Sequence, residues 1–183
     1  MDDLLGRTLL RLARNAIGGH FGLPPQPVDE SAQLQEWAAT FVTLTRHGEL
    51  RGCIGSLEAW RPLAEDVRSN ALAAAFRDPR FPPLSAAELP HTRIEVSLLT
   101  PAEALSCRDE ADALSKLRPH IDGVILSAGR HRATFLPQVW EQLPDPALFL
   151  AQLKRKAGLA ASYWGPEVRL EHYTVRKWQE EEP

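Results

Sequence analysis

The residues best suited to chemistry lie in the segment Phe41–Ser56, which reads FVTLTRHGELRGCIGS. It consists of two apolar runs joined by a turn. Alternation along the second run places Arg51, Cys53 and Gly55 on one face of a strand. A thiol reacts as its thiolate, and a neighbouring guanidinium favours that form. The pattern therefore predicts either a nucleophilic Cys53 with Arg51 as its cation, or a buried thiol that packs as a small hydrophobic side chain.

Two pairs of residues could complete a site around this thiol. Gly52 and Gly55 leave room for a substrate or for another backbone to come close. Asp78 and Arg80 flank a proline in a rigid turn. Arg80 could bind an anion there, or it could form a surface ion pair that adds little stability. All four residues are candidates for substrate binding.

A second polar strand face carries Glu95 and Ser97. The segment TRIEVSLL at 92–99 alternates apolar and polar residues, which predicts a half-buried strand. If this strand neighbours the one with Cys53, Glu95 could pair with Arg51 or act as a general base, and Ser97 could bind substrate. The alternative is an ordinary solvated sheet face.

A short basic run, Lys154–Lys156, lies on a late predicted helix, with Tyr163 and Trp164 following it in the sequence. Charge and stacking in such a run could bind phosphate or single-stranded nucleic acid. The alternative is that the cations form a solvated face and the aromatic residues belong to the core.

Neither a metal nor a nucleotide cofactor is predicted. The histidines are scattered, and His120 with Asp122 is the only pair that has metal-ligand character. Two residues are too few for a metal site. The sequence contains no G-x-G-x-x-G and no P-loop motif, so no cofactor is expected.

Composition limits the class of protein. The chain has 183 residues, a net charge of -3 and two cysteines. This charge balance gives no general attraction to nucleic acid or to anionic membranes. No apolar run approaches the roughly 20 residues that a membrane span needs. The first residues lack the pattern of a signal peptide, so we expect two free thiols in a cytoplasmic protein that does not enter the membrane.

The remaining periodicity predicts an α+β fold with a largely antiparallel sheet flanked by helices. Predicted strands follow one another through short turns, which argues against a doubly wound parallel sheet. The acidic end, 179–183, is expected to be a solvated tail. Helices are predicted at about 4–18, 62–77, 109–117 and 146–157, and strands at about 41–46, 50–55, 92–99, 122–127, 133–136 and 168–175.

Several stretches together resemble the AMMECR domain family, which is named after a chromosomal region deleted in a human contiguous-gene syndrome. The motifs occur in the order of the family and span one domain, about residues 4–178. They are LRGCIGS at 50–56, Pro62-Leu63, DPRFPPL at 78–84, EVSLLTP at 95–101, FLPQVW at 135–140 and FLAQLKRKAGL at 149–159.

This resemblance implies two subdomains, with the LRGCIG segment near a cleft between them. It adds Lys156 to the candidate substrate-binding residues, whereas Lys154 stands where many relatives are expected to have cysteine. Bacterial and archaeal members form component A of the so-called AmmeMemoRadiSam systems. The resemblance therefore suggests a Memo-type protein and a radical SAM protein as partners.

Two functions follow as hypotheses, beside a structural role in a multi-protein complex in which the glycines of LRGCIG serve only close backbone packing. The first is an enzyme or enzyme component that acts on a small molecule or nucleoside. In it Cys53 is a nucleophile or anchor, Arg51 a thiolate partner or anion clamp, and Glu95 an acid, base or orienting group. The alternative is a binding module for RNA or protein, in which Arg51, Arg80 and the run Lys154–Lys156 form one positive face.

Overall fold

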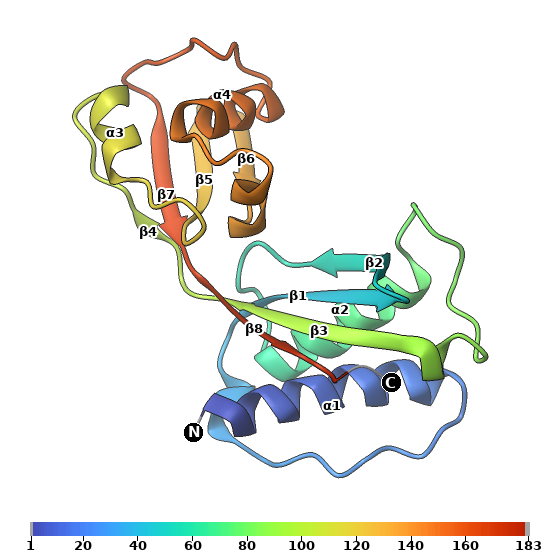
Figure 1. The fold of residues 1–183 in the computed structure, drawn as a ribbon. Helices are drawn as coiled ribbons and strands as arrows, with labels where there is room; N and C mark the ends of the chain where they lie inside the picture. The colour runs from blue at the N-terminus through green and yellow to red at the C-terminus, as the bar shows by residue number, and fades with distance from the viewer. Residues whose placement is uncertain (1, 182–183) are drawn as a thin grey trace. The chain divides into compact units, whose positions relative to one another are not determined.

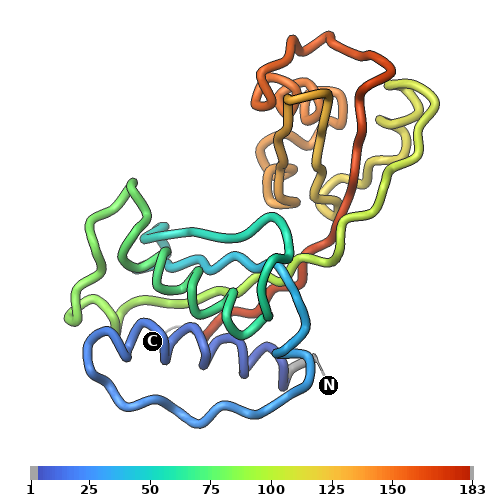
Figure 2. The backbone as a smooth tube through the Cα atoms, turned by 180° about the vertical axis from the view of Figure 1, so that it is seen from behind, coloured from blue at the N-terminus to red at the C-terminus, as the bar shows by residue number. Residues whose placement is uncertain are grey.

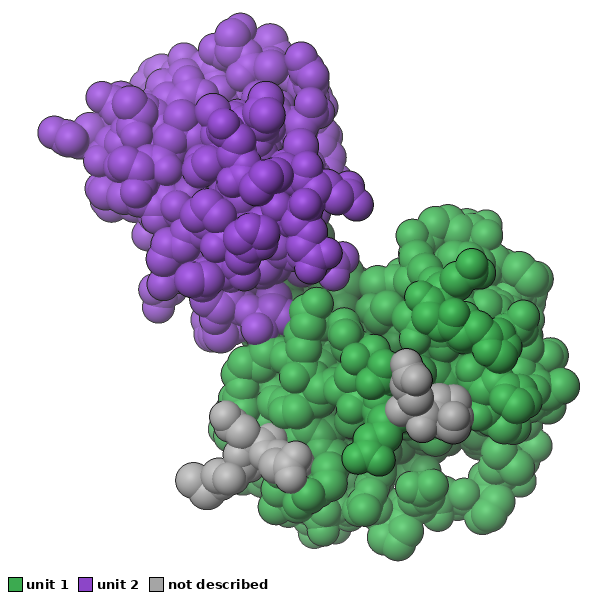
Figure 3. Space-filling model, viewed as in Figure 1, with its two compact units in different colours: residues 1–99, 176–183 green, residues 100–175 purple. Residues whose placement is uncertain are grey.

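The computed structural model describes residues 2–181 of the chain. The chain divides into two compact units (Figure 3). Unit 1 comprises Met1–Leu99 and Arg176–Pro183, and unit 2 comprises Thr100–Val175. Figure 2 shows the consequence for the backbone: the chain leaves unit 1 once and returns to it with its last segment.

Unit 1 is a four-stranded antiparallel sheet with two helices on one face (Figure 1). The strand order is β2-β1-β3-β8, so β1 lies between the two strands that carry most of the predicted site. The elements are α1 (Asp2–His20), β1 (Ala39–Arg46), β2 (Glu49–Gly55), α2 (Leu63–Phe76), β3 (Thr92–Leu99) and β8 (Val175–Gln179), with short 3-10 helices at Ala32–Gln35 and Leu89–His91.

Hydrophobic periodicity explains this arrangement. In α1 the leucines at positions 5, 9 and 12 recur at helical spacing and are buried. In β1 every second residue, Val42 and Leu44, points into the same core, as do Ile94 and Val96 of β3. The opposite face of the sheet is covered by neither α1 nor α2, and we refer to it as the helix-free face.

Unit 2 has a second antiparallel sheet, in the order β4-β7-β5-β6, with its own core. At the centre of this core the rings of Trp140 and Phe149 stack with their centroids 3.7 Å apart. The elements are β4 (Glu103–Ala104), α3 (Glu110–Lys116), β5 (Gly123–Ala128), β6 (His131–Phe135), a 3-10 helix at Pro137–Glu141, α4 (Pro146–Lys156) and β7 (Arg169–Tyr173).

The predicted α+β class is confirmed, with its strands divided between two sheets. The strand predicted at 92–99 coincides with β3, and the helix predicted at 146–157 with α4. The strand predicted at 168–175 is in fact two strands, β7 in unit 2 and β8 in unit 1. In the described part of the chain, no helix has the length and apolar character that crossing a bilayer requires.

The expectation that the acidic end is merely solvated is wrong for Glu180. Its carboxylate accepts a hydrogen bond from Nε of Arg14 at 2.7 Å and one from the backbone N–H of Ile94 at 2.9 Å. These bonds fasten the segment after β8 to α1 and β3, and they explain why the residues preceding the acidic end form a strand of unit 1.

Candidate functional site

The backbone of Cys53 is held on both sides by one turn of the chain. Its N–H donates to Oδ2 of Asp78 at 2.9 Å, and its carbonyl oxygen accepts from Nη2 of Arg80 at 3.3 Å. β2 is an edge strand, so its outer N–H and C=O groups have no neighbouring strand to pair with. The turn after α2 supplies the missing partners through side chains.

Asp78 and Arg80 form a bidentate ion pair in this turn. Nε and Nη2 of Arg80 lie 3.0 and 2.8 Å from the two carboxylate oxygens of Asp78. The side chain of Asp78 is 2% exposed, whereas that of Arg80 is 55% exposed. The hydrogen bond from Arg80 holds the pKa of Asp78 well below its usual range, and the same bond raises the pKa of Arg80.

The thiol of Cys53 lies on the helix-free face of unit 1. Its Sγ is 3.2 Å from Oγ1 of Thr43, the residue opposite it on β1. Thr43 is in turn opposite Glu95 on β3. The three side chains therefore form one row across the sheet. Because neighbouring strands lie about 4.8 Å apart, the backbones of Cys53 and Glu95 are roughly 10 Å apart.

Glu95 has a different partner from the one predicted. Its carboxylate lies 3.6 Å from Nζ of Lys177 on β8, not beside Arg51. The prediction that Glu95 pairs with Arg51 is wrong because β1 separates their strands. The row on the helix-free face thus runs from a thiol through a hydroxyl to a carboxylate and an ammonium group.

The guanidinium of Arg51 forms an ion pair with Glu88 and does not pair with the thiol of Cys53. Leu50 and Gly52 pair with consecutive residues of β1, so Arg51 is the extra residue of a β-bulge. Its Nε donates to Glu88 at 2.9 Å, and its Nη2 donates to the carbonyl oxygen of Pro82 at 2.9 Å. The hydrogen bond from Arg51 lowers the pKa of Glu88 to about 2.

One donor of Arg51 remains without a protein acceptor. Nη1 is buried, and among the residues that the structure describes it is the one buried side-chain nitrogen or oxygen with no hydrogen-bond partner. The residue as a whole is 8% exposed. The ring of Phe81 lies nearby, with its centroid 5.9 Å from the guanidinium carbon. A buried, fixed and unpaired cationic donor is suited to an acceptor oxygen.

The two glycines of the motif serve packing. A Cβ on Gly52 would lie 2.2 Å from the carbonyl oxygen of Ala74 in α2, so this glycine lets the helix approach the strand. A Cβ on Gly55 would lie 2.2 Å from the ring of Phe41, which covers it. Of the two alternatives predicted for these glycines, the close approach of another backbone is confirmed at Gly52, and room for a substrate is not found at either position because protein atoms already occupy it.

The two remaining candidates, Ser97 and Lys156, belong to different units of the fold. Ser97 is buried and pairs in register with Phe41, one row along from Glu95. Lys156 belongs to unit 2, where its Nζ donates to the carbonyl oxygen of Thr134 at 2.9 Å. Unit 1 thus brings together Cys53, Arg51, Glu95, Asp78, Arg80 and Ser97 around β1, β2 and β3.

Lys154 is the clearest departure from the predicted basic surface. Its side chain is 1% exposed, forms an ion pair with Glu110, and donates to the carbonyl oxygen of Ala161 at 3.0 Å. Its Nζ also lies 5.7 Å from the ring centroid of Trp164. With Arg51 buried as well, two of the cations proposed for one positive RNA-binding face are turned into the protein and paired.

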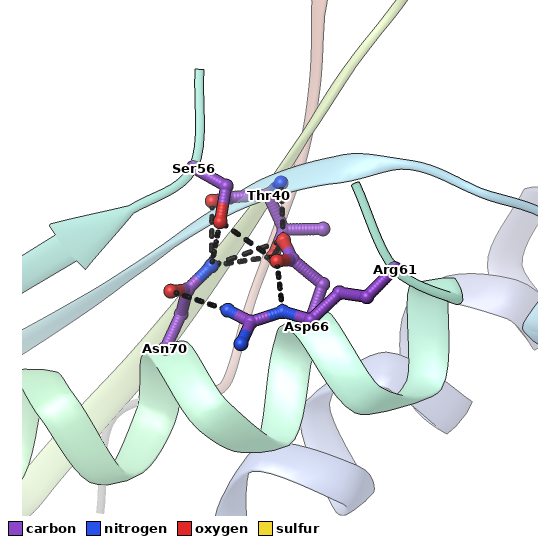
Figure 4. A network of polar contacts seen from close by, with 5 residues as sticks. All are labelled: Thr40, Ser56, Arg61, Asp66 and Asn70. Atoms are coloured by element: carbon purple, nitrogen blue, oxygen red, sulfur yellow. Dashed lines mark hydrogen bonds and ion pairs between the residues drawn. The ribbon is translucent and has the colours of Figure 1, made fainter. Parts of the chain in front are cut away.

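A polar network that the sequence analysis missed lies under the start of α2 (Figure 4). The fully buried carboxylate of Asp66 accepts from both the N–H and the hydroxyl of Thr40, at 2.8 and 2.7 Å. It also accepts from Ser56 Oγ at 2.7 Å and from Arg61 Nε at 2.7 Å. Asn70 donates to it at 3.0 Å. Asp66 and Asn70 interrupt the apolar face of α2, and this was the signal available in the sequence.

Metal ligands do not gather around Cys53. Within residues 2–181 no group of three or more His, Cys, Asp or Glu side chains is arranged to hold a metal ion. Asp122, paired with His120 in the sequence analysis, instead binds Arg118 at 2.7 Å. The groups that the candidate site offers are a thiol, a hydroxyl, carboxylates and cations.

Comparison with known proteins matches residues 10–178 to the AMMECR1 family. A protein of Methanothermobacter thermautotrophicus is 38% identical over 96% of this chain and 94% of its own length. Protein TK0174 of Thermococcus kodakarensis is 37% identical over 100% of this chain and 94% of its own. The crystal structure of the uncharacterised protein PH0010 from Pyrococcus horikoshii superposes with a TM-score of 0.83. The two sequences are 34% identical, and the superposition covers 97% of this chain and 92% of the PH0010 chain.

The family match spans most of the chain and takes in both units of the fold. The archaeal relatives match it over nearly their whole length. The residues matched by the family model include the LRGCIG strand, the turn at 78–80 and the elements of unit 2. This chain belongs to the AMMECR1 family.

Proposed function

We propose that the protein is an enzyme or enzyme component that uses the Cys53 thiol on a small molecule or nucleoside. One observation carries this proposal. Asp78 and Arg80 fix Cys53 through its backbone, and the thiol itself lies on the helix-free face in line with Thr43 and Glu95. Positioning a reactive group through its backbone on a rigid strand keeps its side chain available.

The row of side chains suggests a role for each group. Cys53 would act as nucleophile or as anchor for the substrate, with Thr43 as a hydrogen-bonding neighbour. Glu95 would act as general acid or base, or orient the substrate, beside the ammonium group of Lys177. A molecule that touches both ends of the row must bridge roughly 10 Å.

Arg51 takes an altered role in this proposal. Because Glu88 and Pro82 hold one edge of the guanidinium, Arg51 is not available as a thiolate partner. Its Nη1 has no protein acceptor but is buried, so a ligand would be held by the row on the helix-free face and not by Arg51. Arg80 instead donates to the carbonyl oxygen of Cys53, and Asp78 raises the pKa of its guanidinium.

The experiment compares the alkylation rates of the two cysteines in the same chain. Alkylation with iodoacetamide is followed by mass spectrometry at Cys53 and at Cys107, whose pKa is raised by burial. We expect Cys53 to react faster. A panel of nucleosides, nucleotides and carboxylic acids is then added, and a ligand of the site should slow alkylation at Cys53 and leave Cys107 unchanged.

A variant of Glu95 tests whether the compound that protects Cys53 from alkylation also contacts the other end of the row. Glu95→Gln should weaken protection of Cys53 by the same compound, and Glu103→Gln on β4 serves as the matched control in unit 2. If Cys53 reacts no faster than Cys107, and no compound of the panel protects it, the proposal is wrong.

The proposal also includes two partner proteins. The family resemblance suggests that the protein works with a Memo-type protein and a radical SAM protein. Mixing the three purified proteins and measuring their complex by size-exclusion chromatography tests this part separately. Separate elution of all three would remove the partners without affecting the role of Cys53.

A further inference from the structure

Two of the five tryptophans of the chain lie exposed on unit 1. Trp37 is 67% exposed and Trp60 is 59% exposed, whereas Trp140 in the core of unit 2 is 0% exposed. Leu57 is a third large apolar side chain in the same region, at 46%. Gathered apolar side chains on a surface mark a binding site more often than isolated ones do.

Backbone hydrogen bonds bring the two segments together. The N–H of Ala38 donates to the carbonyl oxygen of Arg61 at 3.3 Å, and the N–H of Leu63 donates to that of Glu36 at 2.8 Å. Between these bonds Trp37 and Pro62 form an isolated antiparallel bridge. The chain before β1 therefore lies beside the chain before α2, which places Trp37 next to the loop that carries Trp60.

The loop is held from below by the buried network of Asp66. Nε of Arg61 donates to Asp66 at 2.7 Å, and Nη2 donates to Asn70 at 3.3 Å (Figure 4). The same guanidinium lies over the ring of Trp60, with its carbon atom 4.2 Å from the ring centroid. One face of an exposed indole is thus fixed against a cation that a buried carboxylate keeps in place.

The charge around the indoles favours one class of partner. Asp66 balances the charge of Arg61. Glu36 directly precedes Trp37 and is exposed, and Glu65 lies exposed in the first turn of α2. Phosphates of a nucleic acid are repelled by carboxylates, whereas a cationic side chain is attracted to both carboxylates and indole faces.

We propose that Trp37, Leu57 and Trp60 form a docking platform for a segment of a partner protein that presents arginine or lysine side chains. Trp60 already stacks on the guanidinium of Arg61. A partner's cationic side chain would stack on the indole surface that remains exposed, while Glu36 and Glu65 attract it. Tryptophan and arginine supported by rigid surroundings are the residues that commonly dominate protein interfaces.

The indole N–H signals in a 15N-edited NMR spectrum report on this directly, because each tryptophan gives its own signal. The probe is a blocked pentapeptide of alternating glycine and arginine, with glutamine replacing arginine in the control peptide. We expect the arginine peptide to shift the signals of Trp37 and Trp60 and to leave that of the buried Trp140 in place. Added salt should weaken the shift.

Variants identify the residues responsible. Trp60→Ala should lower the affinity for the arginine peptide about tenfold, with the signal of Trp178 in β8 showing that unit 1 is still folded. Arg61→Lys keeps the ion pair to Asp66 but loses the planar stack, and should lower the affinity less. Leu148→Ala, at an exposed apolar position of unit 2, is the matched control and should have no effect.

Three results would overturn the proposal. The first is an equal response to the arginine and glutamine peptides. The second is a stronger response of Trp37 and Trp60 to oligouridine, which would indicate a nucleic-acid surface. The third is a shift of the two signals with protein concentration alone, abolished by Trp60→Ala, which would indicate that a second copy of this chain covers the platform.

Discussion

Asp78 binds Cys53 through the backbone: its Oδ2 accepts the Cys53 N–H at 2.9 Å, although 25 residues separate the two in the chain. The carboxylate stands where a neighbouring strand would supply a carbonyl group. Arg80, held by the same carboxylate, supplies the complementary donor to the Cys53 carbonyl. The turn after α2 therefore acts as a substitute strand for two groups of the edge strand, and it sets the position of the thiol.

The change Asp78→Asn tests this relationship. The amide cannot form the ion pair with Arg80, and we expect a loss of about 2–3 kcal/mol in the free energy of unfolding. The amide proton of Cys53 should also exchange faster with solvent. Urea unfolding and hydrogen exchange measure the two effects. Asp29→Asn, in an exposed pair with Arg11, is the control and should change stability by less than about 0.5 kcal/mol. Unchanged exchange at Cys53 would contradict the prediction.

Glu88 makes unit 1 sensitive to acid. Its pKa is about 2 in the folded chain, because Arg51 donates to its carboxylate, and about 4.3 in an unfolded chain. A carboxyl whose pKa is lowered by folding stabilises the protein above the unfolded value, and this stability is lost as the pH falls toward the folded value. Stability should therefore fall between about pH 4 and pH 2.

The variant Glu88→Gln measures the size of that effect. It should be less stable at neutral pH, because Arg51 loses its charged partner, and its stability should depend less on pH between about 4 and 2. Urea unfolding at a series of pH values shows both changes. Parallel curves for the two proteins would mean that Glu88 contributes no pH dependence.

The sequence predicted the strands of the site better than their order. Alternation was enough to find β3 and to place Glu95 and Ser97 on one face, because that pattern is local. It could not show that β1 lies between β2 and β3, since strand order depends on contacts far apart in the chain. Cys53 and Glu95 consequently share a face and a row but do not touch.

Arg51 shows a second limit of sequence reasoning. Simple alternation paired it with Cys53, but a bulge makes Arg51 an extra residue on β2, and a bulge leaves no mark in the hydrophobic pattern. Its partner Glu88 lies 37 residues further along the chain. β8 was missed for a similar reason, because its strand partner β3 belongs to a distant part of the sequence.

Gly52→Ala should destabilise unit 1. The new Cβ would meet the backbone carbonyl of Ala74 at 2.2 Å, and neither the strand nor α2 can move without disturbing the core. We expect a loss of about 1–3 kcal/mol, measured by urea unfolding. Gly19→Ala in α1 is the control, since a Cβ there meets nothing within 4 Å. A neutral Gly52→Ala would show that the helix and strand are less closely fixed than the structure indicates.

Asp66→Asn should be among the most destabilising single changes in unit 1. The carboxylate is 0% exposed and accepts bonds from Thr40, Ser56, Arg61 and Asn70. Removing its charge leaves Arg61 unpaired, which typically costs about 3–5 kcal/mol. The neighbouring exposed Glu65, changed to Gln, should alter stability by less than about 0.5 kcal/mol. Similar unfolding midpoints for the two variants would contradict this reading of the network.

Lys154 allows packing and charge to be separated in unit 2. Its stem is buried, while its partner Glu110 is 36% exposed and can be solvated when the ammonium group is removed. Lys154→Met keeps the volume, so we expect stability within about 1 kcal/mol of the parent protein or above it. Lys154→Ala leaves a cavity and should lose about 2–4 kcal/mol.

Urea unfolding followed by tryptophan fluorescence compares the two variants of Lys154, because Trp164 lies beside the substituted side chain. The expected order of stability places Lys154→Met well above Lys154→Ala. Equal losses in both would show that the ion pair with Glu110, rather than the buried stem, holds α4 to α3. Lys154→Met would then lose as much stability as Lys154→Ala, which would mean that unit 2 requires the buried ammonium group for its stability.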